Sequence, residues 1–367
     1  MDTLSLIPLF SAAVANASVD ISIPIQRVID RHWYVLGEEV ANFEREFAEY
    51  VGVRRCISVA NGTDAIELAL RGLGVGKGDY VVAVANAGFY GSTAIHAIGA
   101  MPLYVDVDDA SLTMSPDALL EALKQKPKAV IVTHLYGQLA NIEELLRITD
   151  AAGVKLVEDC AQSHGAHRGG KQAGSFGAVG CFSFYPTKNL GAIGDGGAVV
   201  TNDMDLASRI QQLRQYGWSK KYQVAVPDGR NSRLDEIQAA VLCEKLPHLN
   251  KCNAERRSIA HRYNMAFATL PLRTPPSTAE DYVAHLYVMR VNSRDTFRAF
   301  LKERGISTDV HYPIPDHLQP AYPQAKYFPL EVTEAASGTV VSLPCFPGLS
   351  ETEVDCVVTV VQDYFQQ

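Results

Sequence analysis

The sequence predicts an α/β fold: a large domain built on a mostly parallel sheet, followed by a smaller C-terminal α+β domain. From Asp79 onward, short apolar segments alternate with amphipathic ones across polar turns, which is typical of parallel strands joined by helices. From about Tyr282 this regular alternation gives way to a mixture of strands and helices. A chain of 367 residues can bury one large core and a smaller one. We therefore expect a large domain over residues 1–250, including a lead-in arm over 1–37, and a small domain over 251–367.

Composition excludes several classes of protein. The chain has 33 basic and 41 acidic residues, a net charge of −8 and no long basic run, so we expect no nucleic-acid partner. No stretch of 18 apolar residues and no basic, apolar leader are present, so we expect no membrane partner and a cytoplasmic protein. The seven cysteines form no C-x-x-C pair, and we predict neither disulfides nor a metal site.

The first elements surround a possible anion site. A helix is expected from about Glu38, after Trp33 and Tyr34, whose rings either line a ligand or pack the arm against the core. A strand over 56–59 then runs through Gly62 and Thr63 directly into a helix. The unpaired N–H groups and positive dipole at a helix start favour a phosphate there, although Thr63 could simply cap its helix.

The repeating region supplies four strands and three helices. The strands are expected over 80–85, 103–107, 129–133 and 154–157, and the helices over 92–98, 116–126 and 142–152. Polar segments over 86–90 and 158–165 follow strand ends, where open α/β sheets bind ligands. The second segment carries Asp159 and Gln162. A buried acid there either meets a ligand or forms an ion pair with a lysine or arginine.

One lysine lies just beyond a buried strand. The apolar run 181–185 stops at Pro186, Lys188 follows, and four glycines precede the next strand over 198–201. Glycines allow close approach of backbone to a ligand, and desolvation lowers the pKa of an amine, which makes it a better Schiff-base nucleophile. The alternative is a solvated lysine in a flexible surface loop.

The remaining elements complete the two domains. A helix is expected over 205–216, and Ser232 with Asp235 resembles a capping box that opens a long helix, which Pro247 must kink or end. A charged helix then continues over 248–270. The small domain is expected to contain strands over 286–291 and 307–312, a helix over 297–304, and a closing helix from Glu351.

Taken together, the motifs resemble one family. They are Gly62-Thr63, an aromatic near residue 89, Glu158-Asp159-x-x-Gln162, Ser183, Phe184-Tyr185-Pro186-Thr187-Lys188-Asn189-Leu190-Gly191 and Asn231-Ser232-Arg233-Leu234-Asp235. From about Ile7 to the C-terminus the chain resembles the sugar-nucleotide aminotransferases of the fold-type I pyridoxal-phosphate (PLP) class. The resemblance implies a seven-stranded sheet and a homodimer with shared active sites.

The resemblance also implies roles for individual residues. Lys188 would form the Schiff base with PLP and carry the proton between cofactor and substrate. Asp159 would face the pyridine nitrogen, and Gln162 the 3-oxygen of the ring. The phosphate would be held by Gly62, Thr63 and Ser183 of the same chain and by Asn231 of the partner chain. Relatives usually place a ring-stacking aromatic at the position of Gly88, so Phe89 next to it is expected to stack.

The form of the lysine motif narrows the substrate. It is similar to that of members which aminate C-3 of a nucleotide-linked hexose, so we expect amino transfer from L-glutamate to a dTDP-linked 3-keto-6-deoxyhexose. The residues implied for the sugar and pyrophosphate are Tyr34, Tyr185, Lys221, His311 and Tyr312. Lys221 is also a cation available for a pyrophosphate.

Several alternatives stay open. The substrate could be a UDP-linked 3-keto-2-acetamido uronate, a 4-keto-6-deoxyhexose or a keto-cyclitol. A sugar dehydratase of this class would carry histidine in place of Lys188, and a non-catalytic PLP-binding regulator would be expected to carry a DNA-binding segment, which is not found. A nicotinamide enzyme would need a G-x-G-x-x-G motif after its first strand, and the sequence has none there.

Overall fold

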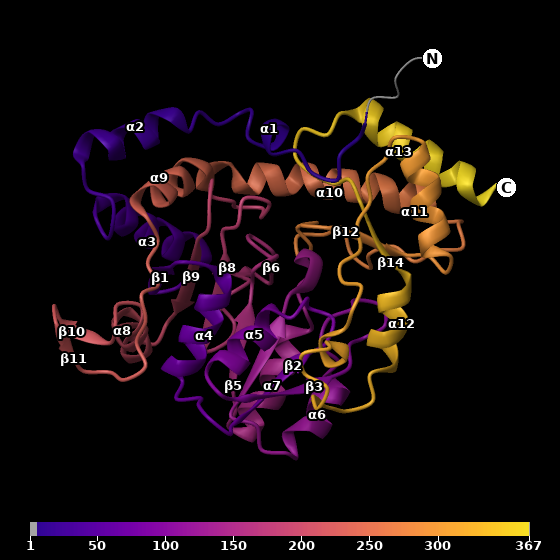
Figure 1. The fold of residues 1–367 in the computed structure, drawn as a ribbon. Coiled ribbons are helices and arrows are strands. Elements are labelled where there is room, and N and C mark those ends of the chain that lie inside the picture. The colour runs from indigo at the N-terminus through magenta and orange to yellow at the C-terminus, as the bar shows by residue number, and fades with distance from the viewer. Residues whose placement is uncertain (1–5, 367) are drawn as a thin grey trace.

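The computed structural model describes residues 6–366 and contains one large sheet (Figure 1). Its order is β1-β9-β8-β5-β4-β2-β3-β13. The strands are β1 Arg55–Val59, β9 Gly197–Thr201, β8 Val179–Ser183, β5 Lys155–Asp159, β4 Ala129–Thr133, β2 Tyr80–Val84, β3 Met101–Val105 and β13 Lys326–Tyr327. Only β9 runs antiparallel to its neighbours, so the prediction of a mostly parallel sheet is confirmed. The predicted count of seven was one short, because β13 contributes just two residues from a distant proline-rich segment.

Helices cover both faces of this sheet because the strands are buried on both sides. The helices α4 Gly62–Gly72, α5 Tyr90–Ala97 and α8 Met204–Leu213 pack on one face. On the other face lie α3 Glu38–Val51, α6 Pro116–Leu123, α7 Ile142–Ala152 and α9 Glu236–Lys245. Neighbouring strand residues alternate between the faces, as Val81 and Val82 do.

The C-terminal part has its own core (Figure 1). Its elements are α10 Leu249–Phe267, the antiparallel pair β12 Tyr287–Arg290 and β14 Val340–Leu343, α11 Arg294–Glu303, α12 Glu331–Thr339 and α13 Glu351–Phe365. Ile7 packs into this core, so the start of the lead-in arm lies against the C-terminal part. The domain division at residue 250 stays a prediction, and residues 1–5 of the predicted arm lie outside the described residues.

Short elements complete the chain. They are α1 Ala12–Ala15, α2 Ser22–Arg31, η1 Leu135–Gly137, β6 His167–Arg168, β7 Lys171–Gln172, β10 Trp218–Lys220, β11 Gln223–Val224, η2 Leu246–His248 and η3 Asp316–Leu318. The β10–β11 hairpin projects from the side of the large sheet (Figure 1). Among residues 6–366, no helix has both the length and the apolar character needed to cross a bilayer.

Two local predictions were wrong. Residues 307–312 do not form a strand, because only Asp309 pairs there, through a single bridge to Ser342. Ser232 does not cap α9. Its buried hydroxyl instead accepts the backbone N–H of Ala60 at 3.1 Å, and Asp235 occupies the N-cap position without a side-chain bond. The Ser232 hydroxyl therefore makes a hydrogen bond to a distant residue instead of the local cap bond that the spacing of Ser232 and Asp235 suggested.

Candidate active site

A cavity of about 610 Å³ opens at the ends of the central strands. Seven of the residues predicted from sequence line it: Gly62, Thr63, Asp159, Gln162, Ser183, Tyr185 and Lys188. Asp159 ends β5, Ser183 ends β8, and Gly62 and Thr63 open α4 just after β1. The sheet and the helix that packs on it therefore bring together residues that are up to 126 positions apart in the sequence.

The start of α4 is shaped to hold an anion. Asn61 is the N-cap, and its side chain accepts the N–H of Asp64 at 2.8 Å, so Thr63 is not the cap. Within the described residues the N–H groups of Gly62 and Thr63 have no acceptor. A Cβ at residue 62 would come within 2.6 Å of the Ser183 Cβ, so only glycine leaves this space open. Free N–H groups, a helix N-terminus and the Ser183 hydroxyl fit a phosphate.

Lys188 and Asp159 are the charged pair of the cavity. Burial lowers the pKa of the Lys188 amine to about 8, although the charge of Asp159 opposes the shift. Burial also raises the pKa of Asp159, against the opposing effects of the Ala161 N–H, the Lys188 charge and the Thr133 hydroxyl. No cation lies within ion-pair distance of Asp159 in the part of the chain that the structure describes. This placement fits a ligand-facing acid and amine better than an ion pair or a solvated surface lysine.

The backbone around Lys188 is held from two sides. The Lys245 ammonium donates to the Gly191 carbonyl at 2.5 Å, and burial lowers the pKa of Lys245 to about 8. The Asn189 amide donates to Asn253 at 2.8 Å and to the Val283 carbonyl at 3.0 Å. These bonds tie the lysine loop to α9, to α10 and to the segment leading into β12, and they restrict the position of the amine.

Gln162 connects two walls of the cavity. Its side-chain oxygen accepts the Tyr136 N–H at 2.6 Å, and its amide donates to the Tyr312 hydroxyl at 3.1 Å. The Tyr312 ring in turn lies against Gly88, where an added Cβ would meet three ring atoms at 2.8–2.9 Å. His311 lies beside it, bonded to Ser342 at 2.8 Å. Neither His311 nor Tyr312 is among the residues that line the cavity, but Tyr312 is bonded to Gln162, which does line it.

Phe89 points elsewhere. Its ring packs 5.1 Å from Tyr322 and 6.0 Å from His96, and it does not line the cavity. Ala87 and Tyr90 line it instead. Phe89 has a φ of 70°, in the left-handed region, so the backbone turns sharply at this residue. As a result, its side chain does not point in the direction expected for the residue that follows Gly88 in an extended segment. The role of ring stacking, which the sequence suggested for Phe89, therefore finds no support in this placement.

Three predicted residues lie away from the cavity. Tyr34 is 48% exposed, Asn231 is exposed in the turn before α9, and Lys221 is exposed on the β10–β11 hairpin. Lys221 lines a separate groove of about 700 Å³ with Trp33, Trp218 and Arg233. The sequence did not single out other residues that line the main cavity: Asn61, Ile66, Tyr90, Thr133, Leu135, Ala161 and Asp195. Asp195 lies within the glycine-rich run of the lysine motif, which was the available signal for it.

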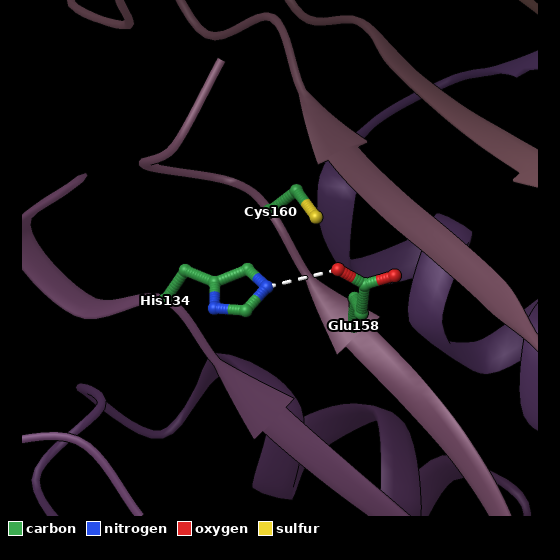
Figure 2. Close-up of side chains that lie close together, drawn as sticks. All are labelled: His134, Glu158 and Cys160. Carbon is green, nitrogen blue, oxygen red and sulfur yellow. Dashed lines mark hydrogen bonds and ion pairs between the residues drawn. The ribbon is translucent and has the colours of Figure 1, made fainter. Parts of the chain in front are cut away.

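A buried cluster beneath the site is structural. Figure 2 shows Glu158, Cys160 and His134, with Nε2 of His134 directed at Glu158. The two oxygens of Glu158 accept from His134 at 3.0 Å and from the N–H groups of Gly174, Phe176 and Gly177 at 2.7–2.9 Å.

The imidazole and the thiol of this cluster are also unavailable to a metal. Nδ1 of His134 accepts the Ala140 N–H at 3.2 Å, so Nε2 carries the proton that Glu158 accepts. Burial raises the pKa of the Cys160 thiol well above its usual value, which keeps the thiol protonated. With the carboxylate and imidazole already bonded, this cluster positions β5 and the loop 174–177 rather than presenting ligands to a metal.

Comparison with known proteins gives the same assignment. The family model described as the DegT/DnrJ/EryC1/StrS aminotransferase family matches residues 18–362. The chain is 44% identical over 342 residues to the dTDP-3-amino-3,6-dideoxy-alpha-D-galactopyranose transaminase of Aneurinibacillus thermoaerophilus, covering 93% of this chain and 94% of that protein. It is 39% identical over 337 residues to the UDP-2-acetamido-2-deoxy-3-oxo-D-glucuronate aminotransferase of Pseudomonas aeruginosa, covering 91% and 92%.

A solved structure matches the whole fold. The crystal structure of DesV from S. venezuelae, in complex with a ketimine intermediate, superimposes with a TM-score of 0.95 at 39% identity and covers 99% of each chain. The family match spans nearly all of the chain, and the aminotransferase relatives are aligned over more than nine-tenths of it. The chain therefore belongs to the DegT/DnrJ/EryC1/StrS aminotransferase family and is a PLP-dependent sugar aminotransferase.

Proposed function

We propose that this enzyme transfers the amino group of L-glutamate to the C-3 keto group of a dTDP-linked 3-keto-6-deoxyhexose. The observation that carries the chemistry is the shared cavity of Lys188 and Asp159, next to a helix start whose N–H groups lack acceptors. The substrate class is supported by the relative from Aneurinibacillus thermoaerophilus, whose name describes a dTDP-linked 6-deoxyhexose with an amino group at C-3. The Tyr185 form of the lysine motif agrees with it.

The cavity offers separate groups for the phosphate, the ring nitrogen and the ring oxygen of PLP. Gly62, Thr63 and Ser183 provide donors for the phosphate, and Asp159 provides the acid that faces a pyridine nitrogen. When bound, PLP supplies an electron sink for the bond changes at the amino carbon. Gln162 has one amide hydrogen beyond its bond to Tyr312, which is available for the ring oxygen.

Lys188 would do the proton chemistry. An amine with a pKa of about 8 exchanges protons readily near neutral pH, where the ordinary lysine value of 10.5 would keep it charged. The bonds from Lys245 and Asn189 restrain the backbone on the C-terminal side of Lys188. In its ionised form, Asp159 would keep a facing ring nitrogen protonated.

We propose that a second copy of the chain completes the site. The cavity needs further cations for a nucleoside diphosphate, and Lys221 and Asn231 are exposed on segments that do not reach their own cavity. A two-fold dimer would exchange these segments reciprocally and give two equivalent sites. The β10–β11 hairpin, which projects from the body of the chain, is the natural segment to do so (Figure 1).

A second substrate class is suggested by the name of another relative. The relative from Pseudomonas aeruginosa is named for a UDP-linked 3-oxo uronate, and it is 39% identical over most of the chain. Such a substrate carries an additional carboxylate, which needs an additional cation in the sugar pocket. Lys188 is the only lysine or arginine among the residues that line the described cavity, so the single-chain site favours the uncharged hexose.

The experiment is a coupled amino-transfer assay. The purified enzyme, loaded with PLP, is given L-glutamate and each of four keto sugars: dTDP-3-keto-6-deoxyhexose, dTDP-4-keto-6-deoxyhexose, UDP-3-keto-2-acetamido uronate and a keto-cyclitol. We expect kcat/KM for the first to exceed the others by about a hundredfold, since leaving one buried polar group unpaired costs about 1–3 kcal/mol. A higher value for the uronate would overturn the substrate assignment but leave the cofactor assignment intact.

A further inference from the structure

A buried carboxylate joins the C-terminal part to the turn that precedes α5. Asp316 is only 1% exposed. One oxygen accepts the backbone N–H of Phe89 at 2.9 Å, and the other accepts the hydroxyl of Ser92 at 2.6 Å. Its own N–H donates to the Ala85 carbonyl at 2.7 Å. Three bonds therefore fasten Asp316 to residues 85–92, just beyond β2.

The carboxylate of Asp316 provides an acceptor at the start of α5, where the N-cap side chain provides none. Phe89 occupies the N-cap position in a left-handed conformation, and its side chain makes no cap bond. Asp316 supplies an acceptor at this helix start, where a negative charge is favourable. Ser92 also accepts the hydroxyl of Tyr104 at 2.9 Å, so its own proton is directed to Asp316. The carboxylate therefore ends a short, fully buried chain of donors.

The anchored segment packs behind the residues that line the active site. Tyr312 lies four residues before Asp316, and Pro313 and Pro315 stand between them with fixed φ angles. At its other end, the Tyr312 ring lies against Gly88, and its hydroxyl accepts from Gln162 at 3.1 Å. Tyr90, whose ring centroid lies 6.1 Å from that of Tyr312, lines the cavity. Asp316 thus holds both Tyr312 and the turn bearing Gly88 and Tyr90.

We infer that Asp316 is a positioning residue for the transferase reaction: it holds Tyr312 against the turn that bears Gly88 and Tyr90, and so fixes the positions of Gln162 and Tyr90, which line the cavity. The inference rests on the proposed function for its catalytic consequence. The structural part does not, because the three bonds and the packing of Tyr312 on Gly88 hold whatever the substrate.

Burial makes this anchor sensitive to loss of either donor. It raises the pKa of Asp316 to about 7, while the bonds from Ser92 and Phe89 work against that shift. The ionised form depends on the two donors, because no cation forms an ion pair with Asp316 within residues 6–366. Replacing the acid by an amide keeps its shape but presents N–H groups to a hydroxyl that already accepts from Tyr104.

The test compares Asp316→Asn with Asp106→Asn. Asp106 is a matched control, because its carboxylate also joins the large part to a C-terminal helix start, accepting the N–H groups of Val332 and Thr333 at 2.9 Å. It does not line the cavity. Hydrogen–deuterium exchange is measured over 86–92 and 311–318 in the PLP-loaded proteins, together with KM and kcat for the keto sugar and the PLP dissociation constant.

For Asp316→Asn we expect faster exchange in both segments and a rise of about tenfold in the keto-sugar KM, consistent with loss of a charged hydrogen bond. Asp106→Asn should leave both quantities near wild type. Ser92→Ala, which removes only one donor, should show a smaller change of the same kind and decides the case if Asp316→Asn does not fold.

Unchanged exchange in the two segments, or equal effects of the Asp106 and Asp316 variants, would overturn the inference. If wild-type enzyme failed to bind PLP or to turn over any keto sugar, the proposed function would fall, while the exchange comparison would still decide the role of Asp316.

Discussion

The floor of the active site and its rim are built differently. The floor consists of Gly62, Asp159, Ser183 and Lys188, which lie at strand ends or helix starts of one sheet and face one cavity. The rim residues Tyr34, Lys221 and Asn231 are exposed and lie outside that cavity. Under the proposed function, one chain supplies the groups that meet the ring and most of the phosphate, whereas Asn231 and the groups that meet the sugar nucleotide would come from a second copy.

The largest expected effect concerns the floor. Lys188→Ala should reduce turnover by about 10⁴-fold, because it removes both the nucleophile and the general base. PLP should still bind, since the phosphate donors and Asp159 remain. Borohydride treatment of PLP-loaded wild type should fix the cofactor on the peptide that contains Lys188, and Lys171→Ala, an exposed control, should behave as wild type. Label on Lys221 or Lys245 would reject the assignment.

The second largest effect is expected for Asp159→Asn, which removes the charge of this side chain but keeps its shape. Asp159→Asn should lower kcat by about a hundredfold, since a neutral amide does not hold a proton on a ring nitrogen. The thermal unfolding temperature should fall little, because burial already raises the pKa of this acid and disfavours its charge. Activity within about threefold of wild type, equivalent to about 0.65 kcal/mol, would make Asp159 a structural residue.

A smaller effect is expected at the phosphate cradle. Gly62→Ala would bring a Cβ within 2.6 Å of the Ser183 Cβ and narrow the space between them, so PLP affinity should fall by about tenfold. Gly76→Ala is the matched control, because a Cβ there meets no atom within 4 Å. The comparison is made by titrating both apo proteins with PLP. Equal dissociation constants for the two variants would show that the phosphate lies elsewhere.

The residues of the floor could be predicted from the sequence better than the residues of the rim. Lys188, Asp159 and Ser183 could be predicted because each follows a strand whose apolar run is visible locally, and strand ends converge. Phe89 and Ser232 could not, because their side chains are set by a left-handed turn and by a bond to Ala60, 172 residues away. The edge strand β13 and the Asp316 anchor depend on contacts over more than 200 residues, which no local pattern encodes.

If Lys188 and Asn231 of one active site come from different chains, mixing two inactive variants should restore activity. Lys188→Ala removes the amine, and Asn231→Trp, at an exposed position bridged to Gln215, is chosen to block the phosphate site of the partner chain. If sites are shared, each heterodimer combines both lesions in one site and leaves the other intact, so about half of wild-type activity per heterodimer should return. Verified subunit exchange without any recovery would contradict the account, because each chain would then build its whole site alone.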